Sequence, residues 1–337
     1  MKIAAIGLLV VGLSCGTLAG CARTPDSAPA VGDAEINIDG SSTVFPITEK
    51  AVNDYRRRNS QASIAVDFSG SGGGFKKFCA GETDVNNASR PINEEELAAC
   101  AASGIDFIEV PVAFDALTVV VHSDNTWADE ITLAELKTLW EPTAEGRVTR
   151  WNQVRATWPD EEIVLFGPGV DSGTFDYFTE AVVGEAGASR RDYTDSEDDD
   201  ELVVGVSENP NALGYFGLAY YARNHEILKS LAVDGGLGPV QPTPNAVVSG
   251  EYFPLGRPLL LYINKASLES KSDLEALLKA YLGSVRNWVP FVGYVPLPPE
   301  AYELALARVE QRKLGTVFGG QIEPGLSIEE VLRRESP

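Results

Sequence analysis

Three short clusters of glycine, serine and threonine each stand directly before a predicted helix. They occupy residues 40–44 (GSSTV), 69–74 (SGSGGG) and 171–174 (DSGT), and the predicted helices begin with the runs FPITEK, FKKFCA and FDYF. The first backbone N–H groups of a helix have no partner within it and lie at the positive end of its dipole, so they attract anions. A single such junction is explained by N-capping. Three of them, with glycines that permit close backbone approach, predict a site for a tetrahedral oxyanion that needs no metal.

A fourth element, residues 84–91 (DVNNASRP), is expected to be a short strand that ends at Ser89 and Arg90. The planar guanidinium of arginine can donate two parallel hydrogen bonds to a phosphate-like anion. The alternative is a surface salt bridge with one of the glutamates that follow. The position after a strand and before Pro91 favours the ligand role.

Short β-branched strands alternate with amphipathic helices from residue 35 onward, as in INIDG before FPITEKAVNDYRRR, which is typical of an α/β fold. Two apolar runs, residues 116–122 (ALTVVVH) and 258–264 (PLLLYIN), are suited to buried strands. We interpret them as two crossings between lobes. The first lobe is then expected to comprise residues 35–117 and 258–337, and the second lobe residues 118–257.

The amino-terminal segment is predicted to direct export. Lys2 precedes an apolar run, residues 3–13, that is short for a membrane span, so residues 1–20 are expected to be a signal peptide. The segment ends in Leu-Ala-Gly-Cys, which resembles the lipobox of bacterial lipoproteins and predicts a diacylglycerol on Cys21. The alternative is an ordinary cleavage site that releases a soluble secreted protein. Residues 21–34, rich in proline, alanine and aspartate, are expected to form a tether.

The four cysteines can be assigned on this interpretation. Cys15 is removed with the signal peptide and Cys21 carries lipid, which leaves Cys79 and Cys100 in an oxidising compartment. A disulfide between these two residues is therefore predicted.

The net charge limits the possible partners. The chain carries a formal charge of −22, and removal of Lys2 makes it −23, which argues against nucleic acid or an anionic membrane surface as a partner. It does not exclude a buried anion, because surface charges are screened over about 10 Å while a buried anion responds to the nearest dipoles. The acidic run at residues 197–201 is interpreted as a solvated loop, with a metal site as the alternative.

At these junctions the sequence resembles the phosphate-specific periplasmic binding proteins of ABC importers, the PstS family, in particular its cyanobacterial-type branch. The resemblance covers essentially the whole mature chain. It rests on these strings, which occur in the family's order: DGSSTVFPIT, FSGSGGGFKKFCAGETDVNNASRPI, LFGPGVDSGTFDYF, SEDDDELVVGV, NALGYFGLAYY, RPLLLYINKASL and VGYVPLPPEAY.

The resemblance implies a two-lobe clamshell of type II, with mixed central sheets, flanking helices and a hinge of two crossing strands. Its phosphate ligands would come from both lobes, as follows: Ser42, Thr43, Val44, Ser71, Ser89 and Arg90 from the first, and Ser172, Gly173 and Thr174 from the second.

This chain departs from the enterobacterial-type pattern at two positions. Pro168 stands where an arginine precedes the SGT turn, and Ser89 stands where an aspartate accepts a hydrogen bond from phosphate. Arg90 is therefore expected to be the charge partner. A carboxylate that accepts the phosphate proton would reject sulfate, which has no proton to donate. Asp171 or Asp198 is a candidate for that role, and Asp171, beside the turn, is preferred.

The function expected from the resemblance is capture of inorganic phosphate and delivery to the permease and ATPase subunits of an ABC importer. A monomer is expected, with no cofactor, no nucleic acid and only a lipid anchor at the membrane. The alternatives are a binder of sulfate, molybdate or arsenate, and a sensor or adhesion protein on the same scaffold. An enzyme is not expected, because the chain has only His122 and His225 as histidines and no G-x-S-x-G spacing around the candidate serines.

Overall fold

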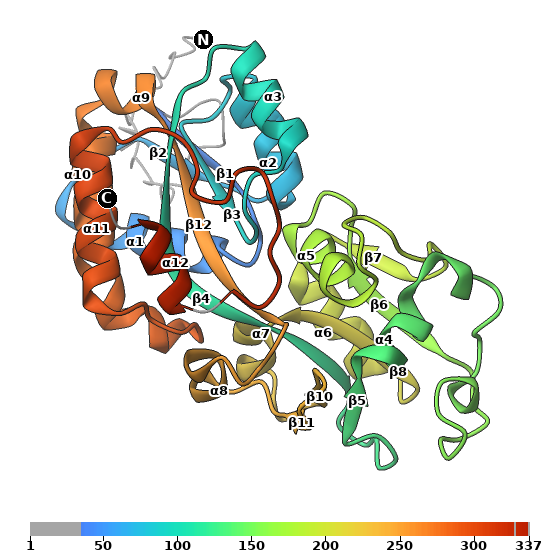
Figure 1. Ribbon diagram of the computed structural model, residues 1–337. Helices are drawn as coiled ribbons and strands as arrows, with labels where there is room; N and C mark the ends of the chain where they lie inside the picture. Colours follow the sequence, from blue (N-terminus) through green and yellow to red (C-terminus); the bar gives the residue numbers. More distant parts are fainter. Residues whose placement is uncertain (1–34, 327, 336–337) are drawn as a thin grey trace, which may run out of the picture.

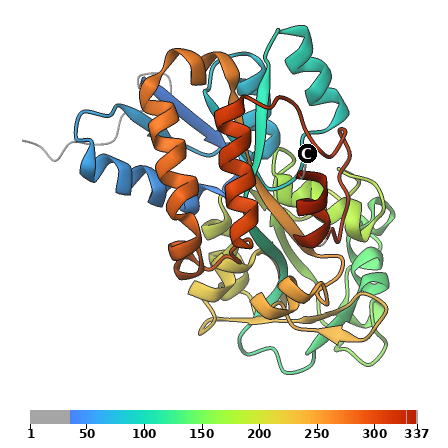
Figure 2. The same ribbon diagram turned by 60° about the vertical axis from the view of Figure 1, so that its left-hand side comes forward.

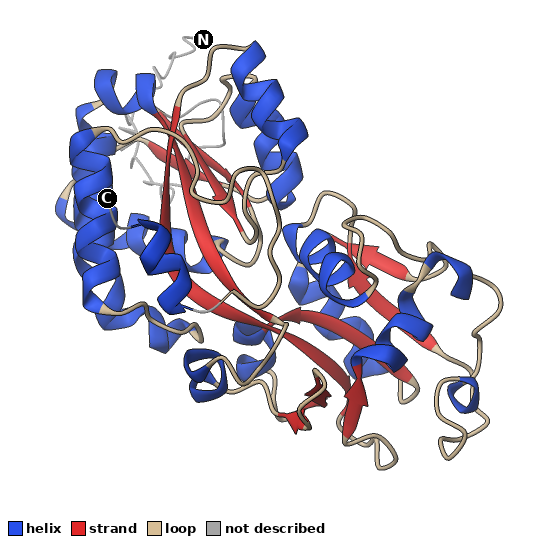
Figure 3. Cartoon of the chain, in the orientation of Figure 1, coloured by secondary structure: helices blue, strands red, loops and turns tan. Residues whose placement is uncertain are grey.

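The protein consists of two lobes joined by a sheet that runs through both (Figure 1). The computed structural model describes residues 35–326 and 328–335. The main sheet has nine strands, in the order β2-β1-β3-β12-β4-β8-β6-β7, with β9 also paired to β4. Helices lie against the sheet in each lobe (Figure 3). The predicted two-lobe α/β fold is confirmed.

The first lobe contains three parallel strands whose carboxyl ends meet at one edge. β1 (Ile36–Gly40) pairs with β2 (Ile64–Val66) on one side and β3 (Val85–Ala88) on the other. In parallel sheets this edge is where ligands bind, at the loops that lead into the following helices. The helices of this lobe are α1 (Phe45–Arg58), α2 (Gly70–Cys79), α3 (Glu94–Ala102), α9 (Lys265–Ser270), α10 (Ser272–Trp288), α11 (Pro299–Gln311) and α12 (Ile328–Glu335), with the 3₁₀ helix η3 (Val289–Val292). Figure 2 shows α10 and α11 packed side by side.

The second lobe repeats this arrangement of three parallel strands. β6 (Val164–Pro168) lies in parallel between β7 (Thr194–Ser196) and β8 (Ala212–Gly217). Its other elements are β9 (Leu228–Ser230), the small sheet of β5 (Glu130–Thr132), β10 (Ala232–Asp234) and β11 (Pro239–Val240), the helices α4 (Leu133–Trp140), α5 (Gly173–Val182), α6 (Asp199–Glu208), α7 (Leu218–Arg223) and α8 (Pro244–Ser249), and the 3₁₀ helices η1 (Pro142–Ala144) and η2 (Trp151–Gln153).

One long strand belongs to both lobes. β4 (Phe107–His122) pairs antiparallel with β12 (Gly256–Asn264) as far as Ala116, and from Leu117 onward it pairs with β8. Its side chains are buried along nearly its whole length, as expected of a strand covered on both faces. β4 thus carries the chain from the first lobe into the second, and β12 begins where the chain has returned to the first lobe.

Two local predictions are corrected by the structure. α2 begins at Gly70 rather than at Phe75, so the glycine-rich cluster forms its first turns. Glycine is a poor helix former, but no other residue fits here: a Cβ on Gly74 would lie 2.0 Å from Asn86 Oδ1. The acidic run is also not a loop throughout, because α6 begins inside it, at Asp199. Carboxylates at a helix N-terminus stabilise the helix.

The predicted disulfide between Cys79 and Cys100 is present and joins α2 to α3. The signal peptide, Cys21 and the tether lie outside the described residues. Within the described part of the chain, no helix combines the length and apolar character that a membrane crossing requires.

Candidate anion-binding site

The carboxyl end of β3 and the first turns of α2 and α5 meet where the lobes touch. Ser71, in the first turn of α2, lies 3.2 Å from the hydroxyl of Ser89, and its own hydroxyl accepts a hydrogen bond from Ser89 N at 3.0 Å. From the second lobe, Gly173 approaches both hydroxyls so closely that a Cβ would lie 2.3 Å from Ser71 Oγ. Only glycine fits at this position, which explains the SGT turn. The three predicted residues are therefore brought together.

Thr43 and Thr174 form a second contact between the two lobes. The two hydroxyls lie 3.3 Å apart and both side chains are fully buried. Thr43 comes from the loop between β1 and α1, and Thr174 from the first turn of α5, where Ser172 is the N-cap and accepts a hydrogen bond from Thr174 N. Opposite lobes thus present hydroxyl groups to one point.

Arg257, the second residue of β12, reaches this point. Its Nη2 donates to Thr174 Oγ1 at 2.9 Å and to Thr43 Oγ1 at 3.3 Å. Arg257 and Asp115 face each other across the β12–β4 pair and form an ion pair at 2.9 Å with both side chains fully buried. The Nη1 atom of Arg257 has no hydrogen-bond partner in the described part of the chain.

Arg257 was not singled out in the sequence, although two signals pointed to it. It stands directly before a proline, as Arg90 does, and at the start of one of the two apolar runs. Asp115 is a single acidic residue just before the other run. Charges of opposite sign beside two runs that are predicted to cross indicate a buried ion pair.

Asp199 was also missed, and it lies on the second-lobe side of the same region. Its carboxylate accepts a hydrogen bond from Ser42 Oγ at 3.5 Å, and the residue is 1% exposed. Burial raises the pKa of Asp199 to about 7, although the positive charge of Arg257 opposes this rise.

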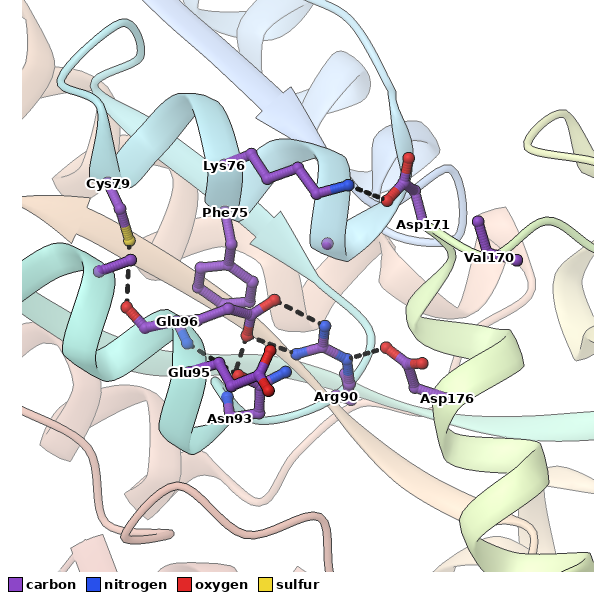
Figure 4. A pocket seen from close by; sticks show the side chains of 12 residues that line it. Phe75, Lys76, Cys79, Arg90, Asn93, Glu95, Glu96, Val170, Asp171 and Asp176 are labelled. Carbon is purple, nitrogen blue, oxygen red and sulfur yellow. Dashed lines mark hydrogen bonds and ion pairs between the residues drawn. The ribbon is translucent and has the colours of Figure 1, made fainter. Parts of the chain in front are cut away.

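The structure gives Arg90 protein partners on every side (Figure 4). Its Nη1 and Nη2 donate to the two carboxylate oxygens of Glu96 at 2.8 and 2.7 Å, and its Nε donates to Asp176 on α5 at 2.7 Å. Burial alone would lower the pKa of Arg90, but the hydrogen-bonded carboxylates raise it above its ordinary value. The sequence offered two alternatives for Arg90, an anion ligand or a surface salt bridge with a following glutamate. A salt bridge with Glu96 is present, and Arg90 is buried in it.

Arg90 lines a pocket of about 440 Å³ between the lobes, alongside α2 (Figure 4). Asp171, from the second lobe, lies at this pocket too. Its carboxylate pairs with Lys76 at 2.5 Å, and its carbonyl accepts a hydrogen bond from Gly72 N at 2.8 Å. Asp171 is thus part of the contact between the lobes, and its side chain is 38% exposed.

Ser42, Val44 and Asp198 are the remaining residues that the sequence suggested for the site. Ser42 and the buried Val44 flank Thr43, and Ser42 also accepts a hydrogen bond on its carbonyl from the Tyr220 hydroxyl at 3.0 Å. Asp198 is the N-cap of α6. Among the described residues, no group of three or more His, Cys, Asp or Glu side chains is arranged to hold a metal ion. The hydroxyls, the glycine backbone and the buried guanidinium together provide hydrogen-bond donors for a small anion.

Comparisons with known proteins place this chain in a family. A family model described as a PBP superfamily domain matches residues 24–283. Protein SphX from a Synechocystis species is 46% identical over 99% of this chain and 96% of its own, and the phosphate-binding protein PstS from Staphylococcus saprophyticus is 32% identical over 93% and 94%. A solved structure, a putative phosphate ABC transporter substrate-binding protein with bound phosphate from Clostridium perfringens, superposes with a TM-score of 0.63 at 26% identity, covering 78% of this chain and 99% of that one. The chain belongs to the PBP superfamily, in the group that contains SphX and PstS.

Proposed function

We propose that this protein captures inorganic phosphate between its two lobes and delivers it to an ABC importer. The observation that carries the proposal is the guanidinium of Arg257, which is fully buried and has an Nη1 group with no acceptor among the described residues. An unpaired buried donor on a charged group is costly. A small anion between the lobes would supply the missing acceptor, and the names of the relatives support phosphate as that anion.

The proposed ligands are the groups that converge on this point. Hydroxyls of Thr43, Ser71, Ser89 and Thr174 and the backbone of Gly173 would donate to the phosphate oxygens. Arg257 takes the charge-pairing role that the sequence suggested for Arg90, because Arg90 is already bonded to Glu96 and Asp176. Ser42, Val44 and Ser172 complete the loops that hold these groups. In this proposal Arg90 and Asp171 act on the contact between the lobes rather than on the anion.

The proposed activity is reversible binding without chemistry. His225 is exposed, and His122 lies at the end of β4, where its Nδ1 accepts a hydrogen bond from Asp124 N. Neither contacts the candidate site, so the hydroxyl groups there have no histidine base to activate them. Hydrogen bonds and one buried cation suffice to bind an anion.

The protein is further proposed to act outside the cytoplasm, held by lipid on Cys21 and reaching the permease through the tether. The support is the lipobox-like sequence and membership in a family of periplasmic binding proteins. Incorporation of labelled palmitate into the wild-type protein, and none into a Cys21→Ala variant, is the expected result. Equal labelling of the two would refute the anchor.

The binding proposal is tested by calorimetric titration of the ligand-free protein with phosphate, arsenate, sulfate and molybdate. Tight phosphate binding is expected. A preference for sulfate or molybdate would show that the same site binds a different oxyanion. Absence of binding to all four anions would overturn the proposal.

A variant pair tests the assigned residues in the same titration. Thr174→Val removes the hydroxyl that contacts Arg257 while keeping the shape of the side chain, and it is expected to weaken phosphate binding about tenfold or more. Thr138→Val makes the same change on α4, where the hydroxyl only bonds to Ala134 O within its own helix, and it should leave the Kd unchanged. Equal affinities for the two variants would contradict the assignment.

A further inference from the structure

The loop between β1 and α1 is buried, so each of its carbonyl groups needs a hydrogen-bond donor. Residues 41–44 are at most 5% exposed. At the start of the loop the donor is a backbone amide, since Phe45 N bonds to Ser41 O at 3.0 Å. At its end the donor is again an amide, since Ile47 N bonds to Val44 O at 3.0 Å. The two carbonyl groups in the middle are bonded differently.

Two tyrosine side chains donate to these middle carbonyls. The Tyr220 hydroxyl donates to Ser42 O at 3.0 Å, and the Tyr294 hydroxyl donates to Thr43 O at 2.5 Å. Both tyrosines are buried. Burial raises the pKa of each hydroxyl above its ordinary value, so at neutral pH both retain the hydrogen that they donate.

The two tyrosines belong to different lobes. Tyr294 follows η3 in the first lobe, where the next residue, Val295, exchanges backbone hydrogen bonds with Phe114 of β4. Tyr220 lies on α7 in the second lobe. Two consecutive peptide groups of one buried loop are therefore held by side chains from both lobes.

A hydrogen bond to a carbonyl also fixes the amide of the same peptide group. In a planar trans peptide the C=O and N–H groups point in opposite directions. The bond to Ser42 O therefore turns the Thr43 N–H away from Tyr220. In the same way, the bond to Thr43 O turns the Val44 N–H away from Tyr294.

We propose that Tyr220 and Tyr294 are positioning residues for the anion site, which hold two carbonyl oxygens away from phosphate and turn the amides of Thr43 and Val44 toward it. This inference rests on the proposed function. A carbonyl that rotated toward the anion would place its partial negative charge against a phosphate oxygen. The Val44 amide has a long bond within the loop, to Ser41 Oγ at 3.4 Å, which leaves its hydrogen available to an anion.

The first test is a calorimetric titration of Tyr220→Phe and Tyr294→Phe with phosphate. Each variant keeps the ring and loses one donor, and each is expected to raise the Kd about tenfold. Tyr302→Phe is the matched control. Its buried hydroxyl bonds to Val112 O and Leu297 N, which lie outside the proposed site, so its Kd should stay within about twofold of the wild-type value. Urea denaturation is expected to show that the control loses at least as much stability as the other two variants.

Nuclear magnetic resonance can observe one of these peptide groups directly. Ser42 is the only serine in the sequence that is followed directly by threonine. Labelling serine carbonyls with ¹³C and threonine amides with ¹⁵N, by cell-free synthesis, therefore selects the Ser42–Thr43 peptide. Phosphate is expected to shift the Thr43 amide proton downfield in the wild-type protein and in Tyr302→Phe. In Tyr220→Phe this shift should be reduced, and the Ser42 carbonyl carbon of the phosphate-bound protein should move upfield because its donor is lost.

The outcomes separate this inference from the function beneath it. Wild-type affinity in folded Tyr220→Phe and Tyr294→Phe variants, or an unaltered Thr43 amide shift in Tyr220→Phe, would overturn the positioning role and leave phosphate capture intact. A wild-type protein that binds no phosphate would overturn both proposals. Melting temperatures verify folding, and because the two tyrosines hold different peptide groups, either variant can decide the question if the other does not fold.

Discussion

Arg257 and Asp115 stand directly opposite each other on β12 and β4, joined at 2.9 Å and fully buried. The pair sits where β4 leaves the first lobe, because the pairing of β4 changes from β12 to β8 just after Ala116. The same ion pair therefore lies both at the crossing between the lobes and at the proposed anion site.

Removing one partner of this pair is expected to damage the fold as well as binding. Arg257→Met should lower the free energy of unfolding by about 3–5 kcal/mol, since it leaves an uncompensated buried charge. The double variant Arg257→Met with Asp115→Leu should recover most of that loss but bind no phosphate. Urea denaturation and calorimetry measure the two effects. Phosphate binding by the double variant at wild-type affinity would show that Arg257 is not the charge partner.

The ion pair between Arg90 and Asp176 is expected to favour the closed state. It joins the lobes at 2.7 Å and is largely excluded from water, so its loss should matter more than that of an exposed pair. Asp176→Asn is predicted to raise the phosphate Kd about tenfold and to reduce the compaction that we expect on phosphate binding, as measured by small-angle scattering.

Lys76→Gln is the matched control for this prediction, because it breaks an exposed pair across the same contact, with Asp171. Its effect on the Kd is expected to be about twofold or less. A larger effect from Lys76→Gln than from Asp176→Asn would contradict the assignment of the closing contact to Arg90.

The disulfide is expected to stabilise the fold without contributing to binding. It closes a loop with a sequence separation of 21 residues, so replacing both Cys79 and Cys100 by alanine should lower the free energy of unfolding by about 3 kcal/mol. The phosphate Kd should change less than about threefold, because Ser71 lies at the opposite end of α2. Loss of binding in a folded double variant would argue instead that the disulfide positions the site.

Stability is expected to depend on pH through Glu197. Burial raises the pKa of Glu197 to about 7, and the nearby carboxylates of Asp171 and Asp195 contribute. The folded state therefore holds a proton that the unfolded state releases at lower pH, so stability falls as the pH rises from about 4.5 to 7. Glu197→Gln should remove part of this fall and gain about 1 kcal/mol at pH 8, once solvent screening is allowed for. Parallel pH profiles for the two proteins, from urea denaturation, would contradict it.

The sequence was sufficient to predict the strands that end at the site and the helix that begins there. β1, β3 and α5 have clear local signals, such as the serine before Gly173 that became the N-cap of α5. The pairing of Cys79 with Cys100 followed from the prediction that Cys15 lies in a signal peptide and Cys21 carries lipid, which leaves two cysteines.

The charges beside the two apolar runs indicated an ion pair, but the place of Arg257 in the site, and that of Asp199, could not be predicted. The ion pair of Arg257 depends on the register of two strands that are 142 residues apart in the sequence, and no local pattern specifies that register. Asp199 stands among four other acidic residues. Only the direction in which α6 enters the lobe turns this one inward and leaves Asp200 exposed. For the same reason, the sequence could not show that Arg90 turns toward Glu96 and Asp176.

The position of Arg257 on a strand that pairs with β4 has a mechanical consequence. In a hinge motion, atoms near the axis of rotation move least and those far from it move most. Arg257 and Asp115 lie beside the point where β4 passes between the lobes, whereas Gly173 and Thr174 are carried by the second lobe. An anion that enters the open protein would therefore meet a stationary positive charge at the pivot, and the hydroxyl and backbone groups of the second lobe would then swing onto an ion already held in place.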